Sequence, residues 1–182
     1  MTHQIMTDQI RIAVTGTPGS GKSTLARTIA RKLDIPYIEA DNLRWGPDWY
    51  VRSDDELRTM AQEQLQAPCW LFDGNYIVLR EMAWPLCNII IWLDYPIAVV
   101  WWRLLCRTLR RLFRGEVLWN GNRERWTYQL RMLRTFFVPI IRSHFAKRRE
   151  YPALLSKYSD ATIVVLHTPK EAQQWLESFL RH

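Results

Sequence analysis

Residues 16–24 read Gly-Thr-Pro-Gly-Ser-Gly-Lys-Ser-Thr and follow directly on an apolar run at residues 10–15. The spacing is that of a phosphate-binding loop, in which glycines let successive backbone N–H groups point inward at phosphate oxygens. A helix over residues 22–33 would add its positive N-terminal end at the same place. A chance match in a glycine-rich turn is the alternative, but the strand before the loop and the helix after it argue against one. The sequence therefore predicts a site for a nucleoside triphosphate.

The side chains of the loop have expected contacts of their own. Lys22 can reach the β- and γ-phosphates of a nucleotide, and the hydroxyl of Ser23 can ligate magnesium. The candidate residues for binding ATP are Gly16, Thr17, Pro18, Gly19, Ser20, Gly21, Lys22, Ser23 and Thr24.

The apolar pattern of the rest of the chain predicts the fold. Four further runs have the length of buried strands, at residues 36–40, 69–73, 88–94 and 161–166. Helical patterns lie at residues 22–33, from about 53, after 96, at about 125–147 and at 168–179. This alternation predicts an α/β, three-layer P-loop NTPase fold with a parallel five-stranded sheet. Ligands of such sheets bind at the carboxyl ends of the strands, where Asp41, Asp73 and Asp94 fall.

Two helix starts are marked by capping residues. Ser53 and Glu56 have the Ser-x-x-Glu spacing of a capping box, and Thr168 comes before a first-turn proline, Pro169. We expect helices to begin at these two places.

Length and composition limit the class of protein. The 182 residues fit a single domain, which we expect to span residues 1–182. The three cysteines lie in apolar stretches without metal-ligand spacing, which favours free thiols in a reducing, cytoplasmic setting. The first nine residues lack the apolar middle of a secretion signal, and the longest apolar stretch contains charged residues and a proline. We therefore expect a soluble protein without a membrane partner.

Positive charge is concentrated in one segment. Residues 103–149 contain 13 Lys or Arg and two acids, so the segment carries +11 and the rest of the +7 chain carries −4. All but one of these cations are arginines, whose planar fork binds phosphate oxygens bidentately. The segment is longer than one crossover helix requires, with probable turns at Gly115 and at residues 120–122. We expect an arginine-rich helical lid at about 103–149; a solvated basic helix face is the alternative for any single arginine.

Beyond the loop, five different short motifs are distributed along most of the chain. They are Asp41-Asn-Leu-Arg-Trp45, Asp73-Gly-Asn-Tyr76, Trp92-Leu-Asp-Tyr-Pro96, Leu118-Trp-Asn-Gly-Asn-Arg-Glu124 and Arg149-Glu-Tyr-Pro152. With the phosphate loop, this set resembles the small P-loop kinases related to adenylate kinase, and more closely the topology-modulation (FlaR-like) family. The family name describes a proposed influence on DNA topology, whereas the residues resemble those of a phosphotransferase.

The resemblance implies an acceptor site after the second strand. An Asp-x-x-Arg there helps nucleoside monophosphate kinases to hold the acceptor and its phosphate, and Asp41 and Arg44 have this spacing. Asp41 could orient an acceptor hydroxyl or take its proton, and Arg44 could neutralise a phosphate. The alternative is that Asp41 caps a turn and Arg44 is solvated. Trp45 could stack on a ring of the substrate or belong to the core.

The resemblance also implies a magnesium partner at the third strand. Asp73 and Gly74 match an Asp-Gly pair whose aspartate contacts the metal through water in adenylate-kinase-like enzymes. Magnesium keeps several waters, so Ser23 and Asp73 would suffice as protein ligands. Asp94 is the rival for this role, although we favour a place for it at the start of the following helix.

Two arginines of the lid match a pair by which related kinases bring cations onto the nucleotide. Arg103 and Arg107 are four residues apart and would share one helix face. They could stabilise the charge of the transferring phosphoryl group. Where related kinases carry an acceptor-binding arginine, this chain has Ile77, and the nearest arginine is Arg80. We therefore include Arg80 among the substrate-binding candidates and leave the acceptor unassigned.

Taken together, the residues predict an ATP-binding, magnesium-dependent phosphotransferase acting on a small molecule or a nucleotide. Lys22, Asp41, Arg103 and Arg107 are the catalytic candidates. One alternative is a nucleotide-dependent regulator that binds DNA or RNA through the basic segment, which no helix-turn-helix or zinc motif supports. A simple ATPase is the other.

Overall fold

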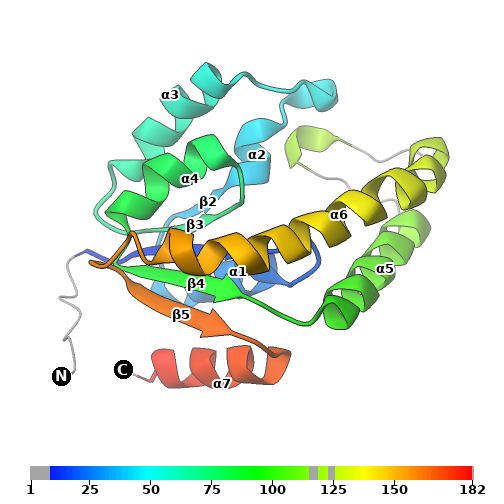
Figure 1. The fold of residues 1–182 in the computed structure, drawn as a ribbon. Coiled ribbons are helices and arrows are strands. Elements are labelled where there is room, and N and C mark those ends of the chain that lie inside the picture. Colours follow the sequence, from blue (N-terminus) through cyan, green and yellow to red (C-terminus); the bar gives the residue numbers. More distant parts are fainter. Residues whose placement is uncertain (1–8, 115–118, 123–125, 182) are drawn as a thin grey trace.

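The computed structural model of the protein describes residues 9–114, 119–122 and 126–181, without the side chains of 111–114 and 126–138. Its centre is one sheet of five parallel strands in the order β2-β3-β1-β4-β5 (Figure 1). The strands are β1 (Arg11–Gly16), β2 (Tyr37–Glu39), β3 (Trp70–Asp73), β4 (Ile89–Leu93) and β5 (Thr162–Leu166). Each lies at one of the predicted apolar runs, so the expectation of a parallel five-stranded α/β fold is confirmed.

Helices cover both faces of the sheet. One face packs against α1 (Lys22–Leu33) and α7 (Pro169–Phe179), and the other against α3 (Asp54–Leu65), α4 (Ile77–Ala83) and the last turns of α6 (Trp126–Leu155). Figure 1 shows α6 crossing the sheet and α5 (Ile97–Arg114) rising beside it at the end where β1 and β4 terminate. The short elements are α2 (Ala40–Arg44), η1 (Pro47–Trp49), η2 (Trp84–Leu86) and η3 (Trp119–Gly121).

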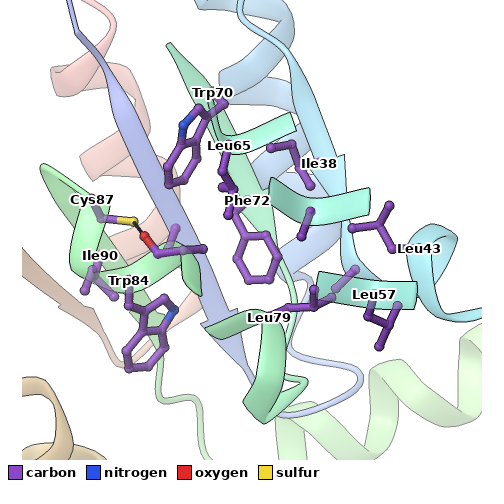
Figure 2. Close-up of a cluster of buried hydrophobic side chains, with 14 of the residues drawn as sticks. Ile38, Leu43, Leu57, Leu65, Trp70, Phe72, Leu79, Trp84, Cys87 and Ile90 are labelled. Carbon is purple, nitrogen blue, oxygen red and sulfur yellow. Dashed lines mark hydrogen bonds between the residues drawn. The ribbon is translucent and has the colours of Figure 1, made fainter. Parts of the chain in front are cut away.

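The alternation of side chains along the strands produces two separate cores. Ile12 and Val14 of β1 face α1 and α7, whereas Ala13 between them faces the opposite layer. In that opposite core, Phe72 and Trp70 of β3 lie among aliphatic side chains from α3 and α4 (Figure 2). Both faces of the sheet are therefore buried, as a parallel sheet requires.

Both predicted helix starts are present. The Ser53 hydroxyl accepts from the Glu56 N–H and the Glu56 carboxylate accepts from the Ser53 N–H at 2.7 Å, which completes the capping box. The Thr168 side chain accepts from Glu171 N–H at the start of α7.

Two features of the helices differ from the sequence expectation. α6 continues to Leu155 instead of ending near residue 147, because Tyr151 and Leu155 pack into the core and outweigh the cost of Pro152 within the helix. The helices α2 and α4 were not predicted, since each is shorter than the periodic pattern needs. No helix in the described ranges is long and apolar enough to cross a membrane.

Candidate functional site

The phosphate loop joins the carboxyl end of β1 to the first turn of α1. Gly19 and Gly21 have φ angles of 92° and 93°, which glycine adopts without the penalty of a side chain. The Ser20 N–H donates to the Thr17 carbonyl at 2.9 Å and closes the loop. A Cβ at Gly21 would lie 2.9 Å from Nη1 of Arg103, so this glycine also makes room for a cation.

Side chains from two distant segments hold the loop in place. Asn75 accepts from the Thr15 hydroxyl at 2.8 Å through Oδ1 and donates to the Gly16 carbonyl at 2.8 Å through Nδ2. The Thr17 hydroxyl lies 3.1 Å from Nδ1 of His144, a residue of α6 that is 2% exposed. Burial and the neighbouring Arg148 lower the pKa of His144, so the ring stays neutral. Asn75 lies inside the Asp73–Tyr76 motif but was assigned no role there, and His144 carried no sequence signal.

Lys22 lies between the two oxygen ligands expected for magnesium. Its Nζ is 3.5 Å from Oδ1 of Asp73 and 3.5 Å from the Ser23 hydroxyl. Asp73 is 2% exposed, and its Oδ2 accepts from the Tyr37 hydroxyl at 2.8 Å. Burial and the nearby carboxylates of Asp73 and Glu39 raise the pKa of Tyr37, which keeps it a neutral donor. In the described residues Asp73 Oδ1 has no hydrogen-bond partner, so the Lys22 ammonium is its neutralising contact.

Asp94 has a different environment from Asp73. Its Oδ1 lies 2.8 Å from Nε of Arg148, and its Oδ2 lies 3.4 Å from Nδ1 of His167. Both oxygens therefore face side chains of α6 and of the segment before α7, and Asp94 does not line the cleft. In the described part of the chain, no group of three or more His, Cys, Asp or Glu side chains could hold a metal ion. A buried carboxylate oxygen beside a hydroxyl fits a magnesium ion that keeps most of its waters, which favours Asp73 and Ser23.

The acceptor candidates after β2 separate into two places. Asp41 lines the cleft, and its Oδ1 accepts from the Tyr76 hydroxyl at 2.9 Å. Arg44 instead pairs with Asp54 at 2.8 Å and lies over the Tyr76 ring, outside the cleft. Trp45 also lies outside, with its ring edge-on to Trp49 at 5.6 Å. The structure therefore brings Asp41 to the site but neither Arg44 nor Trp45.

The candidates from the third strand and from α4 face the same cleft as Asp41. Gly74 lies where a Cβ would overlap the Cβ of Ala40, so only glycine allows α2 to approach β3. Arg80 lies over the Trp84 ring at 5.4 Å, and its Nε is buried without a hydrogen-bond partner in the described chain. Gly74 and Arg80 line the cleft, whereas Asp73 is buried and does not line it.

Arg103 and Arg107 approach the cleft from α5. Arg103 donates from Nη1 to the Ser20 carbonyl at 2.8 Å and lies over the Tyr95 ring at 5.4 Å. Arg107 lies one turn further along α5 and lines the cleft, as does Arg110. The side chains of Arg111 and Arg114 and the expected turn at Gly115 lie outside the described residues.

All of these elements surround one cleft of about 1070 Å³. Its lining includes seven basic side chains, from Lys22, Arg27, Arg80, Arg103, Arg107, Arg110 and Lys147. Three acids also line it, from Glu39, Asp41 and Glu150. The cleft has room for a nucleotide and a second small molecule, and the excess of cations favours anionic ligands.

Lys147 is one of the cleft residues that sequence analysis did not single out. Burial, followed by the charges of Lys22 and Arg80, lowers its pKa to about 8. Its Nζ lies 6.0 Å from the ring centre of Tyr151. The available signal was that Lys147 is the one lysine among the 13 basic residues of 103–149, but no pattern placed it in the site.

A few hydrogen bonds join residues 119–122 to the segment that includes α2 and η1. Asn122, 4% exposed, donates from Nδ2 to the Gly46 carbonyl at 2.9 Å and accepts from the Trp49 N–H at 2.9 Å. Asn120 donates to the Trp45 carbonyl. We call this contact between residues 119–122 and residues 42–49 the clasp. It confirms a turn at residues 120–122, because the Asn122 N–H donates to the Trp119 carbonyl at 3.2 Å.

In sequence, the chain matches one family model and several individual proteins. Residues 12–73, from β1 through the phosphate loop to β3, match the family model of the ATPase family associated with various cellular activities. A shikimate kinase from Rippkaea orientalis is 28% identical over 132 residues, which is 65% of this chain and 71% of that protein. A shikimate kinase from Paracidovorax citrulli is 49% identical over 35 residues, only 19% of either chain.

Two solved structures resemble the whole chain. A shikimate kinase from Bacteroides thetaiotaomicron matches with a TM-score of 0.50 and 19% identity, over 94% of this chain and 96% of that one. A gluconokinase from Sinorhizobium meliloti matches with a TM-score of 0.51 and 18% identity, over 96% of this chain and 95% of that one. At these identities the likeness concerns the fold, and the fold is that of the P-loop kinases.

Proposed function

We propose that this protein is an ATP- and magnesium-dependent kinase that transfers the γ-phosphoryl group to a small-molecule acceptor. One observation carries the proposal: the phosphate loop, the Asp41 carboxylate, Arg103 and Arg107 line a single cleft, and the buried Asp73 lies 3.5 Å from the Lys22 ammonium of that loop. A site for hydrolysis alone would not need a second carboxylate across the cleft from the loop. The relatives named as shikimate kinases and a gluconokinase support a small-molecule acceptor.

The donor side would act by charge stabilisation. The N–H groups of the loop and the Lys22 ammonium would bind the β- and γ-phosphates, and Arg103 and Arg107 would meet the negative charge of the transferring group. Ser23 and Asp73 would hold magnesium, which when bound neutralises charge on the phosphate oxygens. Because Lys22 faces Asp73 in the structure, its turn toward the phosphates would free Asp73 Oδ1 for a metal-bound water.

The acceptor side would act through Asp41. A carboxylate at this place can accept the hydrogen bond of an acceptor hydroxyl and take its proton as the new O–P bond forms. The Tyr76 hydroxyl would hold the carboxylate in position, since it donates to Asp41 Oδ1. Burial and the Asp41 charge raise the pKa of Tyr76, so it remains a donor. Gly74 and Arg80 complete this wall, whereas Arg44 and Trp45 would support α2 from outside.

We also infer membership of the topology-modulation family, related to adenylate kinase. Three of the motifs that carry this resemblance contribute to the cleft, through Asp41, Tyr76 and Tyr151. Asp41 accepts a hydrogen bond from the Tyr76 hydroxyl, and the Tyr151 hydroxyl lies 3.2 Å from the Thr15 hydroxyl. A cytoplasmic location fits the thiols of Cys87 and Cys106, which form no disulfide.

The proposal is tested by a screen for acceptor-dependent ADP formation over hydroxylated acids, sugars, nucleosides and nucleotides. With the best acceptor, we expect Lys22→Ala to lower turnover by roughly 10²- to 10³-fold, by analogy with loss of a single transition-state donor. Lys32→Ala, an exposed lysine at the end of the same helix, should match the wild type. Asp41→Asn should abolish transfer while leaving nucleotide affinity unchanged.

Two results would contradict the proposal. ADP formation that no acceptor stimulates would indicate an ATPase, and wild-type turnover in Lys22→Ala would remove the loop from catalysis. The second candidate, a nucleotide-dependent regulator of nucleic acid, rests on the +11 charge of residues 103–149. In that case duplex affinity and not turnover would respond to substitution of Arg107 and Arg110.

A further inference from the structure

Lys147 is a cation in the wall of the cleft. It comes from α6, is partly buried, and lines the cleft beside Tyr151. In the described part of the chain, no carboxylate pairs with its ammonium and none contributes to its pKa. A buried ammonium group without a partner costs free energy, so its place here calls for a ligand that supplies negative charge.

Two further cations converge on Lys147 from other elements. Lys22 of α1 and Arg80 of α4 both act on its charge, and Arg80 has a buried Nε without a hydrogen-bond partner in the described residues. On its own helix the charged neighbours His144 and Arg148 are turned to Thr17 and Asp94, respectively. Lys22, Arg80 and Lys147 all line the cleft. Of the acids nearby, Asp73 already lies against Lys22, and Glu150, which also lines the cleft, pairs with Arg149 at 3.5 Å.

These cations exceed what a nucleotide requires. The triphosphate would occupy the loop, Lys22, Arg103 and Arg107, all on the donor side of the cleft. Arg80 instead belongs to α4, which begins directly after Tyr76, the residue that holds Asp41. Arg80 thus borders the part of the cleft next to the candidate acceptor carboxylate, and Lys147 lines the same cleft close enough to Lys22 and Arg80 for their charges to act on it.

We propose that Arg80 and Lys147 bind an oxyanion group, a carboxylate or a phosphate, on the acceptor itself. The acceptor would then be a small anionic hydroxy compound, with its hydroxyl at Asp41 and its charged group between these two cations. This inference rests on the proposed kinase function and narrows its substrate class. Neutral sugars and nucleosides would lack the group that the pair binds.

The pH dependence of binding has a defined sign. The ammonium of Lys147 is charged below a pKa of about 8 and neutral above it, so the oxyanion should bind more weakly as pH rises from 7 to 9. Bound oxyanion stabilises the charged form and raises the pKa, so binding near pH 8 to 8.5 should take up a proton.

The test uses the full chain with its donor site filled by magnesium and a non-hydrolysable ATP analogue. Inorganic phosphate, and malonate in a parallel arm, are then titrated by calorimetry into wild type, Lys147→Gln, Lys147→Arg and the exposed control Lys157→Gln. We expect one further anion to bind to the wild type, at least tenfold weaker binding in Lys147→Gln, and recovery in Lys147→Arg. The arm that binds more tightly distinguishes a phosphorylated from a carboxylated acceptor.

Equal anion affinity in wild type and Lys147→Gln would overturn the inference. So would a loss of nucleotide affinity with unchanged anion affinity, which would assign Lys147 to the donor side. If the wild type binds no nucleotide, the kinase proposal fails separately. The oxyanion site is then judged by the same phosphate titration in a Lys22→Ala background, where the ammonium of the loop is absent.

Discussion

Gly74 sets how closely α2 can approach the end of β3. It follows β3 directly, and α2, which carries Asp41, packs against it at Ala40. A side chain at residue 74 would overlap the Cβ of Ala40 and would also come within 3.2 Å of the Phe72 ring. The absence of a side chain at this one position therefore allows Asp41 to reach Tyr76.

We expect Gly74→Ala to lower the free energy of unfolding by about 1–3 kcal/mol, the usual cost of overpacking a buried site. The measurement is denaturant unfolding at equilibrium. The double variant Ala40→Gly, Gly74→Ala removes the overlapping methyl group, so it should lose less stability than the two single changes added together. Strict additivity, or a Gly74→Ala protein as stable as the wild type, would show that α2 can move away freely.

Lys22 and Lys147 have the same side chain but different charged neighbours. Lys22 lies against the buried Asp73 carboxylate, whereas Lys147 faces Lys22 and Arg80 and has its pKa lowered. Both ammonium groups are positioned before any ligand binds. The Lys22 ammonium is stabilised by the Asp73 carboxylate. Under our proposal, the Lys147 ammonium gains its counter-charge from the bound anion.

At the scale of elements, α6 combines a fixed part with a part that belongs to the expected lid. His144, Arg148 and Tyr151 contact Thr17, Asp94 and Thr15, so the last turns of the helix are attached to the ends of β1 and β4. Any lid motion within residues 103–149 would therefore involve the residues before His144.

The clasp joins this lid segment to the loop after α2. Asp48, Trp49 and Asn120 have φ angles between 53° and 60°, a left-handed conformation that costs non-glycine residues roughly 1–2 kcal/mol each. Hydrogen bonds from the buried Asn122 side chain offset this cost. The clasp is thus an element that a few interactions hold closed.

We expect Asn122→Ala to release the clasp, because it removes the donor to the Gly46 carbonyl and the side-chain acceptor of the Trp49 N–H, a loss of about 1–3 kcal/mol. Water would then reach the cleft more readily, so the ratio of ATP hydrolysis to transfer should rise. Hydrogen exchange at the Trp49 N–H should accelerate as well. Asn42→Ala, an exposed residue of α2, is the matched control. An unchanged hydrolysis ratio together with unchanged exchange would show that the clasp does not close the site.

The whole molecule concentrates positive charge around the cleft. Seven basic and three acidic side chains line it, and the segment 103–149 carries +11 in a chain of +7. A concave positive surface attracts small anions into the site and raises their rate of association. It could also attract nucleic acid, and the two possibilities differ in their salt dependence.

For a kinase we expect duplex DNA to bind only non-specifically, with Kd in the range of about 10⁻⁴–10⁻⁶ M at 0.15 M salt. DNA should also leave acceptor turnover unchanged at that salt concentration. The measurement is a fluorescence titration of labelled duplex over 0.05–0.2 M salt, with and without nucleotide. Tight binding that depends on nucleotide, with a log–log slope of about −0.9 for each phosphate neutralised, would favour the regulator instead.

The parts of this protein that its sequence determined are those encoded by neighbouring residues. The apolar runs, the glycine spacing of residues 16–21 and the capping box at Ser53 gave the strands, the phosphate loop and the start of α3, because local backbone preferences and alternation act over a few residues. The same pattern placed Asp41, Asp73 and Asp94 at strand ends. It could not tell which of them face a ligand.

Tertiary structure decided the surroundings of those residues. Asp94 forms an ion pair with Arg148, which lies 54 positions away in the sequence, and Arg44 pairs with Asp54. Lys147 lines the cleft from α6, a helix that continues beyond Pro152 because its last residues pack into the core. Such pairings depend on long-range packing, which no short window of sequence contains. The charge of each group can be read in the chain, but the counter-charge that it meets is fixed only when distant elements pack together.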